Sequence, residues 1–174
     1  MKPSFAPLLL ATTLSAACAS TAAVSRPSPF PGAPAPGLPE ARAGAAAAPS
    51  PAAESVVQLA LGMRGVRYRL GGEEPARGFD CSGLVRYVFE QHQIEMPRTV
   101  TEQYRVGRRV NPRDLRVGDL LFFSTIGRGA THVGIVVGSG EFVHAPGTGE
   151  VVRVDRYDTP YWRDRLVGIR RPPV

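Results

Sequence analysis

Three residues of this 174-residue chain have side chains suited to nucleophilic catalysis, namely Cys81, His132 and His144. Cys81 follows Asp80 and precedes an apolar stripe at helical spacing, so we expect it in the first turn of a helix. Unpaired N–H groups and the helix dipole favour a negative charge there, and therefore the thiolate, which is the nucleophilic form. A small buried core residue is the alternative for a lone cysteine.

The two histidines flank a turn-forming segment, residues 138–140 (GSG). If these three residues form the loop of a β-hairpin, His144 lies opposite Gly134, which shares a face with His132. The two histidines are then diagonal neighbours on one face of the sheet. A two-residue loop would instead place them on opposite faces, because side chains alternate along a strand.

A thiol at a helix start and two histidines on one sheet face form the arrangement of a papain-like nucleophilic site. We expect His132 to accept the proton of Cys81 and to return it to the leaving amine, while His144 fixes the tautomer of His132. A zinc site with a bound water is an alternative use of the same three ligands, and two structural histidines are another. Activation by the helix dipole favours the nucleophile, so no metal and no other cofactor is expected.

The elements that position these residues change character along the chain. Apolar spacing predicts a helix over residues 54–62, a second beginning after Asp80, and a third over 99–106 that opens with a Thr99–Glu102 capping box. Short β-prone runs then predict strands at 119–124, 131–137, 141–145, 151–154 and 166–170. Helices followed by strands imply an α+β domain in which N-terminal helices pack on a C-terminal antiparallel sheet.

Length and composition indicate one domain with a long tail. Eight of the 17 prolines fall between Arg26 and Ala53, so we expect a disordered Ala/Pro-rich tether over 19–53 and a folded domain over 54–174. The formal charge is +6, but basic-aromatic motifs and zinc-finger spacings are missing from the sequence, so nucleic acid is not an expected partner. Two cysteines form no disulfide framework.

Residues 1–18 have the layout of a secretory signal peptide, with Lys2 followed by a mainly apolar run over 5–14. That run is too short to span a bilayer permanently. Cleavage after Ala19 would give a soluble exported protein, whereas cleavage before Cys18 with lipidation of that cysteine resembles a bacterial lipoprotein signal. We favour lipidation of Cys18 and expect an outer-membrane lipoprotein that faces the periplasm, or otherwise a periplasmic or secreted protein.

Five segments, in order, resemble the NlpC-type cell-wall cysteine endopeptidases. They are residues 80–85 (DCSGLV), 96–99 (MPRT), 118–123 (GDLLFF), 131–136 (THVGIV) and 142–145 (FVHA). The resemblance covers about residues 54–172 and implies a papain-like α+β fold. It also implies hydrolysis of amide bonds in peptidoglycan stem peptides or crosslinks, for remodelling or turnover of the cell wall. By this resemblance Cys81 matches the nucleophile, His132 the general base and His144 the third polar member.

Four further residues are candidates for binding the substrate or the oxyanion. Tyr68 matches the family's tyrosine near the oxyanion site, although Leu70 stands where members often have an aromatic residue. Asp80 and Ser82 are candidates for binding a free amine or other polar groups, with helix capping as the alternative for Asp80. Arg98 is a candidate for holding a stem-peptide carboxylate, with an ordinary surface arginine as the alternative.

Other functions are compatible with the same residues. A non-catalytic peptidoglycan-binding lipoprotein would keep the groove without the chemistry, and a zinc-dependent amidase would act on the same substrate. Acyl transfer would use the same thiol chemistry with a different acceptor. The expected partners are peptidoglycan as substrate and the membrane through the N-terminal lipid, with the protein acting as a monomer.

Overall fold

The computed structural model describes residues 48–174. The predicted signal peptide, the predicted lipidation site at Cys18 and residues 19–47 of the predicted tether lie outside the described residues. Over 48–174, no helix has both the length and the apolar character needed to cross a membrane.

The first helix, α1 (Pro51–Gly62), begins three residues before the expected domain boundary at residue 54. Its N-cap is Ser50, whose side chain accepts a hydrogen bond of 3.1 Å from the backbone N–H of Ala53. Pro51 occupies the first turn, where its missing N–H costs nothing. These local signals extend the helix into the end of the predicted tether.

The second helix, α2 (Cys81–Glu90), begins where the sequence predicts, with Asp80 as its N-cap. The apolar residues of its stripe, among them Leu84 and Val88, are fully buried. The short helix α3 (Val100–Gln103) has the predicted capping box between Thr99 and Glu102 but ends earlier than expected.

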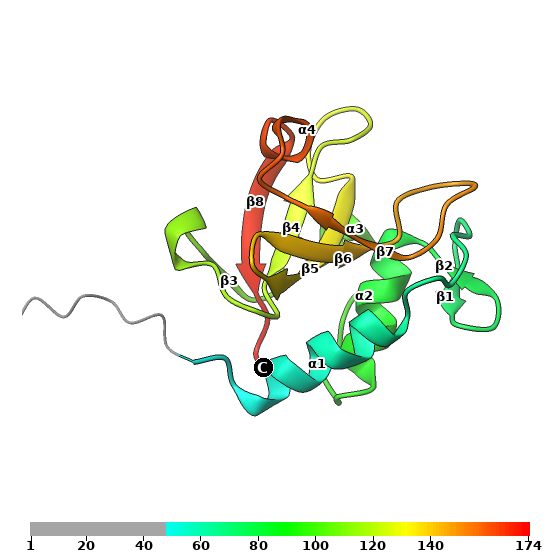
Figure 1. Ribbon diagram of the computed structural model, residues 1–174, viewed down its shortest axis with the longest axis horizontal. Helices are drawn as coiled ribbons and strands as arrows, with labels where there is room; N and C mark the ends of the chain where they lie inside the picture. Colours follow the sequence, from blue (N-terminus) through cyan, green and yellow to red (C-terminus); the bar gives the residue numbers. More distant parts are fainter. Residues whose placement is uncertain (1–47) are drawn as a thin grey trace, which may run out of the picture. The chain divides into compact units, whose positions relative to one another are not determined.

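The strands form one six-stranded antiparallel sheet in the order β3-β8-β4-β5-β6-β7, beside a two-stranded ribbon of β1 and β2 (Figure 1). The six strands are β3 (Arg108–Arg109), β4 (Leu120–Phe123), β5 (His132–Gly138), β6 (Glu141–His144), β7 (Arg153–Arg156) and β8 (Leu166–Arg171). The ribbon strands are β1 (Glu73–Glu74) and β2 (Gly78–Phe79), and two short helical turns are η1 (Pro112–Asp114) and α4 (Pro160–Arg163). The five predicted strands correspond to β4–β8, with β7 shifted two residues later. The predicted α+β fold with helices packed on an antiparallel sheet is confirmed.

The two faces of the sheet pack against different partners. Helices α1 and α2 lie side by side on one face (Figure 1), where Phe122, Val133 and Ile135 pack with the apolar residues of the helices. The other face packs with α4, through a cluster that includes Phe123 and Trp162. Burying each large apolar side chain contributes about 2 kcal/mol to folding, so both faces hold the sheet in place.

The hairpin between β5 and β6 has a different loop from the predicted one but the same pairing of the residues near the histidines. Gly138 pairs with Glu141, so the loop has two residues rather than three. A register shift between Val136 and Gly138 adds one residue to β5, and beyond it Ile135 pairs with Val143. This β-bulge restores the register that a three-residue loop would have produced, which places both histidines of the hairpin on one face.

A buried ion pair ties the end of β8 to the start of β4. Asp119 is fully buried and accepts hydrogen bonds from Arg171 Nε at 2.6 Å and Nη2 at 2.7 Å. The backbone N–H of Arg116 donates to the same carboxylate at 2.8 Å. Asp119 therefore stabilises the fold by joining these two strands, and it also belongs to the turn before β4.

Replacing Asp119 tests its contribution to stability. Asp119→Ala should lower the free energy of unfolding by about 3 kcal/mol, because it leaves the Arg171 guanidinium largely buried without its partner. Urea denaturation measures the change. The matched control is Asp164→Ala, which removes an exposed pair with Arg163 and should leave stability unchanged. Equal losses in both variants would contradict the assignment.

Candidate active site

Cys81 is the first residue of α2 and is a free, partly buried thiol. Helix α2 packs on β5, and the backbone N–H of Val133 points toward the Cys81 sulfur, as do those of Ser82 and of Cys81 itself. Because Val133 follows His132 directly, the start of α2 lies at the strand end that contains His132. The predicted placement of the thiol at a helix start is confirmed.

The environment of this thiol does not favour the thiolate. Burial and the adjacent Asp80 carboxylate raise the pKa of Cys81 to about 11, and the three N–H groups only partly oppose this. The sequence-based expectation of a thiolate at rest is therefore wrong. The physical reasons are that burial disfavours the charged form of the thiol and that the N-cap carboxylate lies at the same helix end, where it offsets the dipole. The thiol is therefore protonated at neutral pH.

The histidines meet as predicted. His132, the first residue of β5, and His144, the last of β6, have Nε2 and Nδ1 atoms 2.8 Å apart. Both are buried, with His132 4% and His144 0% exposed. Since Nε2 of His132 is engaged by His144, Nδ1 is the only ring nitrogen of His132 left for the thiol. The same-face arrangement inferred from the hairpin is thus observed.

A carboxylate extends this pair. Asp155 of β7 places Oδ2 3.0 Å from Nε2 of His144. Arg153 contacts the same carboxylate, with Nε 3.0 Å from Oδ1 and Nη2 3.2 Å from Oδ2. Sequence analysis missed Asp155, since β7 begins two residues later than predicted. The sequence did contain an indication of Asp155, because it is an acidic residue two positions after Arg153 and so lies on the same face of a strand, next to the strand predicted after the hairpin.

Aromatic rings enclose the histidine pair. Trp162 of α4 stacks on His132 at 5.6 Å between ring centroids and meets His144 edge-on at 5.1 Å. Phe142 stacks on His144 at 4.6 Å. A side chain at Gly134 would collide with the Phe142 ring, so glycine there makes this packing possible. These contacts exclude water from the imidazoles and restrict their rotation.

Enclosure keeps both imidazoles neutral. Burial lowers the pKa of His132 to about 3, with a further contribution from the charge of His144, while Asp155 opposes the shift. Burial lowers the pKa of His144 to about 4, again opposed by Asp155. The site therefore combines a neutral thiol with neutral imidazoles.

The predicted substrate-binding residues Asp80, Ser82 and Arg98 lie together and bind one another. Arg98 donates to Asp80 through Nη1 at 3.1 Å and Nη2 at 2.6 Å, and to Ser82 Oγ at 2.9 Å. Its Nε contacts Glu73. The Asp80 carboxylate also accepts the backbone N–H groups of Gly83 and Gly71, and these donors with Arg98 outweigh burial and lower its pKa.

Tyr68 lies beside this cluster, in the segment before β1. Burial raises the pKa of the Tyr68 hydroxyl, as do the neighbouring Cys81 and Asp80 side chains, whereas Arg98 opposes the shift. Gln103 is a further residue that sequence analysis missed. Its buried amide donates to the carbonyls of Ser82 at 2.9 Å and Pro97 at 2.7 Å, which ties α2 to the segment before Arg98.

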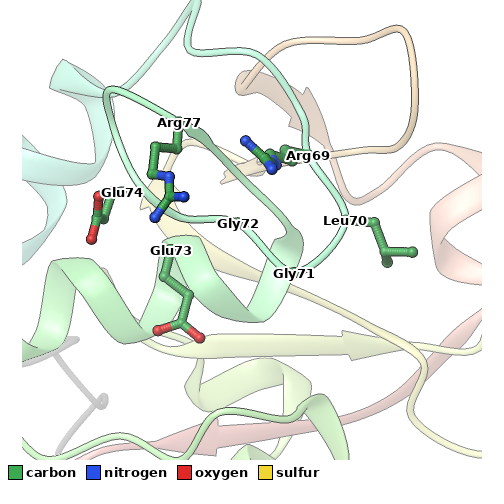
Figure 2. A pocket seen from close by; sticks show the side chains of 7 residues that line it. All are labelled: Arg69, Leu70, Gly71, Gly72, Glu73, Glu74 and Arg77. Atoms are coloured by element: carbon green, nitrogen blue, oxygen red, sulfur yellow. The ribbon is translucent and has the colours of Figure 1, made fainter.

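A surface pocket borders the cluster but does not include the thiol or the histidines. It is formed by residues 69–74 and Arg77 (Figure 2). Leu70 points away from the loop and is 81% exposed. Gly71, which lines the pocket, donates its N–H to Asp80 at 2.9 Å. This hydrogen bond links the pocket wall to the N-cap of α2.

The described part of the chain has no metal-binding arrangement. Between residues 48 and 174, no group of three or more His, Cys, Asp or Glu side chains is placed to hold a metal ion. In the histidine pair, the facing nitrogens bond to each other and do not converge on a shared ligand.

The family model of the "NlpC/P60 family" matches residues 65–171, which is more than half of the chain and includes Cys81, His132, His144 and Asp155. The chain belongs to the NlpC/P60 family. The family resemblance inferred from the five sequence segments is thereby confirmed.

Curated relatives in the NlpC/P60 comparison have names that refer to hydrolases. The chain is 43% identical over 128 residues to "Gamma-DL-glutamyl hydrolase" of Bacillus subtilis (strain 168), covering 72% of this chain and 31% of the relative. It is 44% identical over 111 residues to "Murein DD-endopeptidase MepH" of Escherichia coli (strain K12), covering 62% and 41%. The chain thus spans less than half the length of these relatives.

Solved structures of NlpC/P60 proteins share the fold. A family protein from Bacillus cereus ATCC 10987 superposes with a TM-score of 0.65 at 33% identity, covering 71% of this chain and 41% of that one. A lipoprotein-like member from Staphylococcus aureus subsp. aureus Mu50 gives a TM-score of 0.64 at 33% identity, covering 71% and 42%. The papain-like architecture of the described domain follows from these similarities.

The lowered pKa values of the two histidines predict how stability depends on pH. Both folded values lie below the ordinary 6.5, so between about pH 6.5 and 4 the unfolded chain binds more protons than the folded one. The free energy of unfolding should therefore fall as the pH is lowered from 6.5 toward 4. Asp80 and Asp155 have lowered values and titrate below this window.

Urea unfolding at several pH values, followed by fluorescence of the single tryptophan, measures this dependence. His144→Gln removes one of the two groups, so its stability should change less steeply over the same window than that of the natural protein. Parallel curves for the two proteins would contradict the buried, neutral state of His144.

Proposed function

We propose that this domain is a cysteine endopeptidase that hydrolyses amide bonds in peptidoglycan stem peptides or in the crosslinks between them. The observation that supports this most directly is the buried pair of His132 and His144 at the strand end beside the Cys81 thiol. The names of the relatives, a gamma-DL-glutamyl hydrolase and a murein DD-endopeptidase, support the substrate class.

In the proposed reaction, Nδ1 of His132 takes the proton of Cys81 as the sulfur attacks the carbonyl carbon of the amide. The backbone N–H of Cys81 and the Tyr68 hydroxyl stabilise the oxyanion. The C–N bond then breaks, and His132 gives the proton to the leaving amine, which leaves a thioester. Water attacks the thioester and passes a proton through His132 to the departing sulfur, which releases the carboxylate and restores the thiol.

We assign the remaining predicted residues to substrate positioning. Asp80, Ser82 and Arg98 lie at the start of α2 and can present charge to the amine and carboxylate groups of a stem peptide. Much of their hydrogen-bonding capacity is spent within the cluster, so the cluster also holds the start of α2 rigid. Such rigidity favours catalysis because it holds the nucleophile in one geometry.

Digestion of purified peptidoglycan, followed by mass spectrometry of the released fragments, tests the proposed activity. The natural protein should release fragments with a new carboxylate and a new amine, and their masses identify the bond. Cys81→Ala should release none while keeping its thermal unfolding transition, because the thiol forms the bond to the substrate. Cleavage by a folded Cys81→Ala variant would refute the thiol mechanism, and fragments joined to a second amine would indicate acyl transfer.

We further propose that the protein is exported and anchored in the outer membrane by a lipid on Cys18, and that it acts as a monomer. The support is the sequence of residues 1–18. In a bacterial host, the full-length protein should sediment with membranes and gain the mass of the lipid. Cys18→Ser should remove both properties. An unlipidated soluble protein cleaved after Ala19 would contradict the anchor while leaving the enzymatic proposal intact.

A further inference from the structure

The site contains a carboxylate that the proposed reaction does not use. Asp155 of β7 lies beyond the second histidine, with its side chain 23% exposed and its Oδ2 3.0 Å from Nε2 of His144. It forms no contact with the thiol in the structure. The Asp155 carboxylate differs chemically from the two imidazoles. An ionised carboxylate can only accept hydrogen bonds, whereas a neutral imidazole donates through one nitrogen and accepts through the other.

This difference determines which atom donates in the hydrogen bond between Asp155 and His144 and in the one between His144 and His132. Because Asp155 can only accept, His144 must carry its proton on Nε2. Nδ1 of His144 is then the acceptor, so Nε2 of His132, 2.8 Å away, must carry the proton of that ring. Nδ1 of His132 is left without a proton, which is the form a base needs.

The Asp155 carboxylate is held in one position and kept ionised by its neighbours. Arg153 contacts both oxygens of Asp155, at 3.0 and 3.2 Å, and its Nη1 also donates to Glu150 at 2.5 Å. Arg153 and His144 outweigh burial and lower the pKa of Asp155, so it stays ionised at neutral pH. The negative charge of Asp155 therefore persists whenever the two histidines are neutral.

We infer that Asp155 is a positioning residue that sets the tautomers of both His144 and His132, and thereby leaves Nδ1 of His132 free to accept the Cys81 proton. The catalytic consequence of this inference rests on the proposed function, whereas the tautomers themselves do not. Asp155 acts through the two imidazoles and requires no contact with substrate.

The variant Asp155→Ala removes the acceptor of the Nε2 proton of His144. Without that acceptor the proton of His144 is no longer held on Nε2, so both rings can change tautomer together and part of the population has a proton on Nδ1 of His132. We expect kcat to fall on the order of 100-fold or more with little change in KM, as loss of the orienting carboxylate does in other triads.

The matched control is Asp158→Ala. Asp158 has the same relation to Arg156 that Asp155 has to Arg153, two residues along the chain with Nε 3.0 Å from Oδ1, but it is exposed and lies away from the histidines. This variant should leave the tautomers, kcat and KM unchanged.

The readout is ¹⁵N NMR of the imidazoles in the full chain at neutral pH, since the shifts of the two ring nitrogens identify which one carries the proton. The natural protein and Asp158→Ala should show His132 and His144 protonated on Nε2, and Asp155→Ala should show both rings as mixtures of the Nε2-protonated and Nδ1-protonated forms. Protonation on Nε2 alone in Asp155→Ala would overturn the inference.

The natural protein alone also decides the question if Asp155→Ala does not fold. Protonation of Nδ1 on His132 or His144 in the natural protein would overturn the inference without any variant. Because the tautomers are measured without substrate, a protein that shows them as expected but does not cleave peptidoglycan would refute the proposed function and leave the role of Asp155 standing.

Discussion

The hydrogen bond between His132 and His144 imposes a requirement on the whole sheet, since both rings must lie on the same face of two adjacent strands. A two-residue loop alone would place the rings on opposite faces. The bulge in β5 after Val136 adds the one residue that corrects this. Three successive residues of the turn, 138–140, have positive φ values of 111°, 52° and 83°, two of them at glycines that tolerate it. The backbone geometry at the loop end of the hairpin thus determines that His132 and His144, at its other end, lie on the same face of the sheet.

Burial then determines the protonation states of the site. Trp162 and Phe142 cover the imidazoles, so the charged forms are disfavoured and both rings are neutral. The same effect, together with the Asp80 carboxylate, keeps the thiol protonated. A protonated thiol is a weaker nucleophile than a thiolate, which limits reaction of Cys81 with electrophiles and oxidants.

The start of α2 is held more firmly than helix capping alone would require. Asp80 caps the helix and binds Arg98, and Gln103 ties the carbonyl of Ser82 to that of Pro97. Asp80 also accepts the backbone N–H of Gly71, so Cys81 is fixed relative to the loop before β1, where Tyr68 lies. The network thus joins this loop, the start of α2 and the segment before α3.

Local patterns in the sequence determined the helices α1, α2 and α3, the five longer strands, the α+β class and the choice of Cys81, His132 and His144 as candidate residues, whereas the short turns α4 and η1 were not predicted. Each of these depends on capping, periodicity or motif order, which are properties of contiguous segments. The two-residue strands β1, β2 and β3 were missed, because runs so short have no periodicity. The beginning of α1 at Pro51 was also missed, because the Ala/Pro composition masked its cap at Ser50.

Only the tertiary structure decided the features that depend on distant contacts. The bulge, the pairing of Arg98 with Asp80, the buried contact of Arg171 with Asp119 and the contact of Asp155 with His144 each join residues that no local pattern relates. The pKa of Cys81 belongs to the same class. A helix start predicts a stabilised thiolate, but burial and a neighbouring carboxylate reverse that preference, and both are set by how the chain packs.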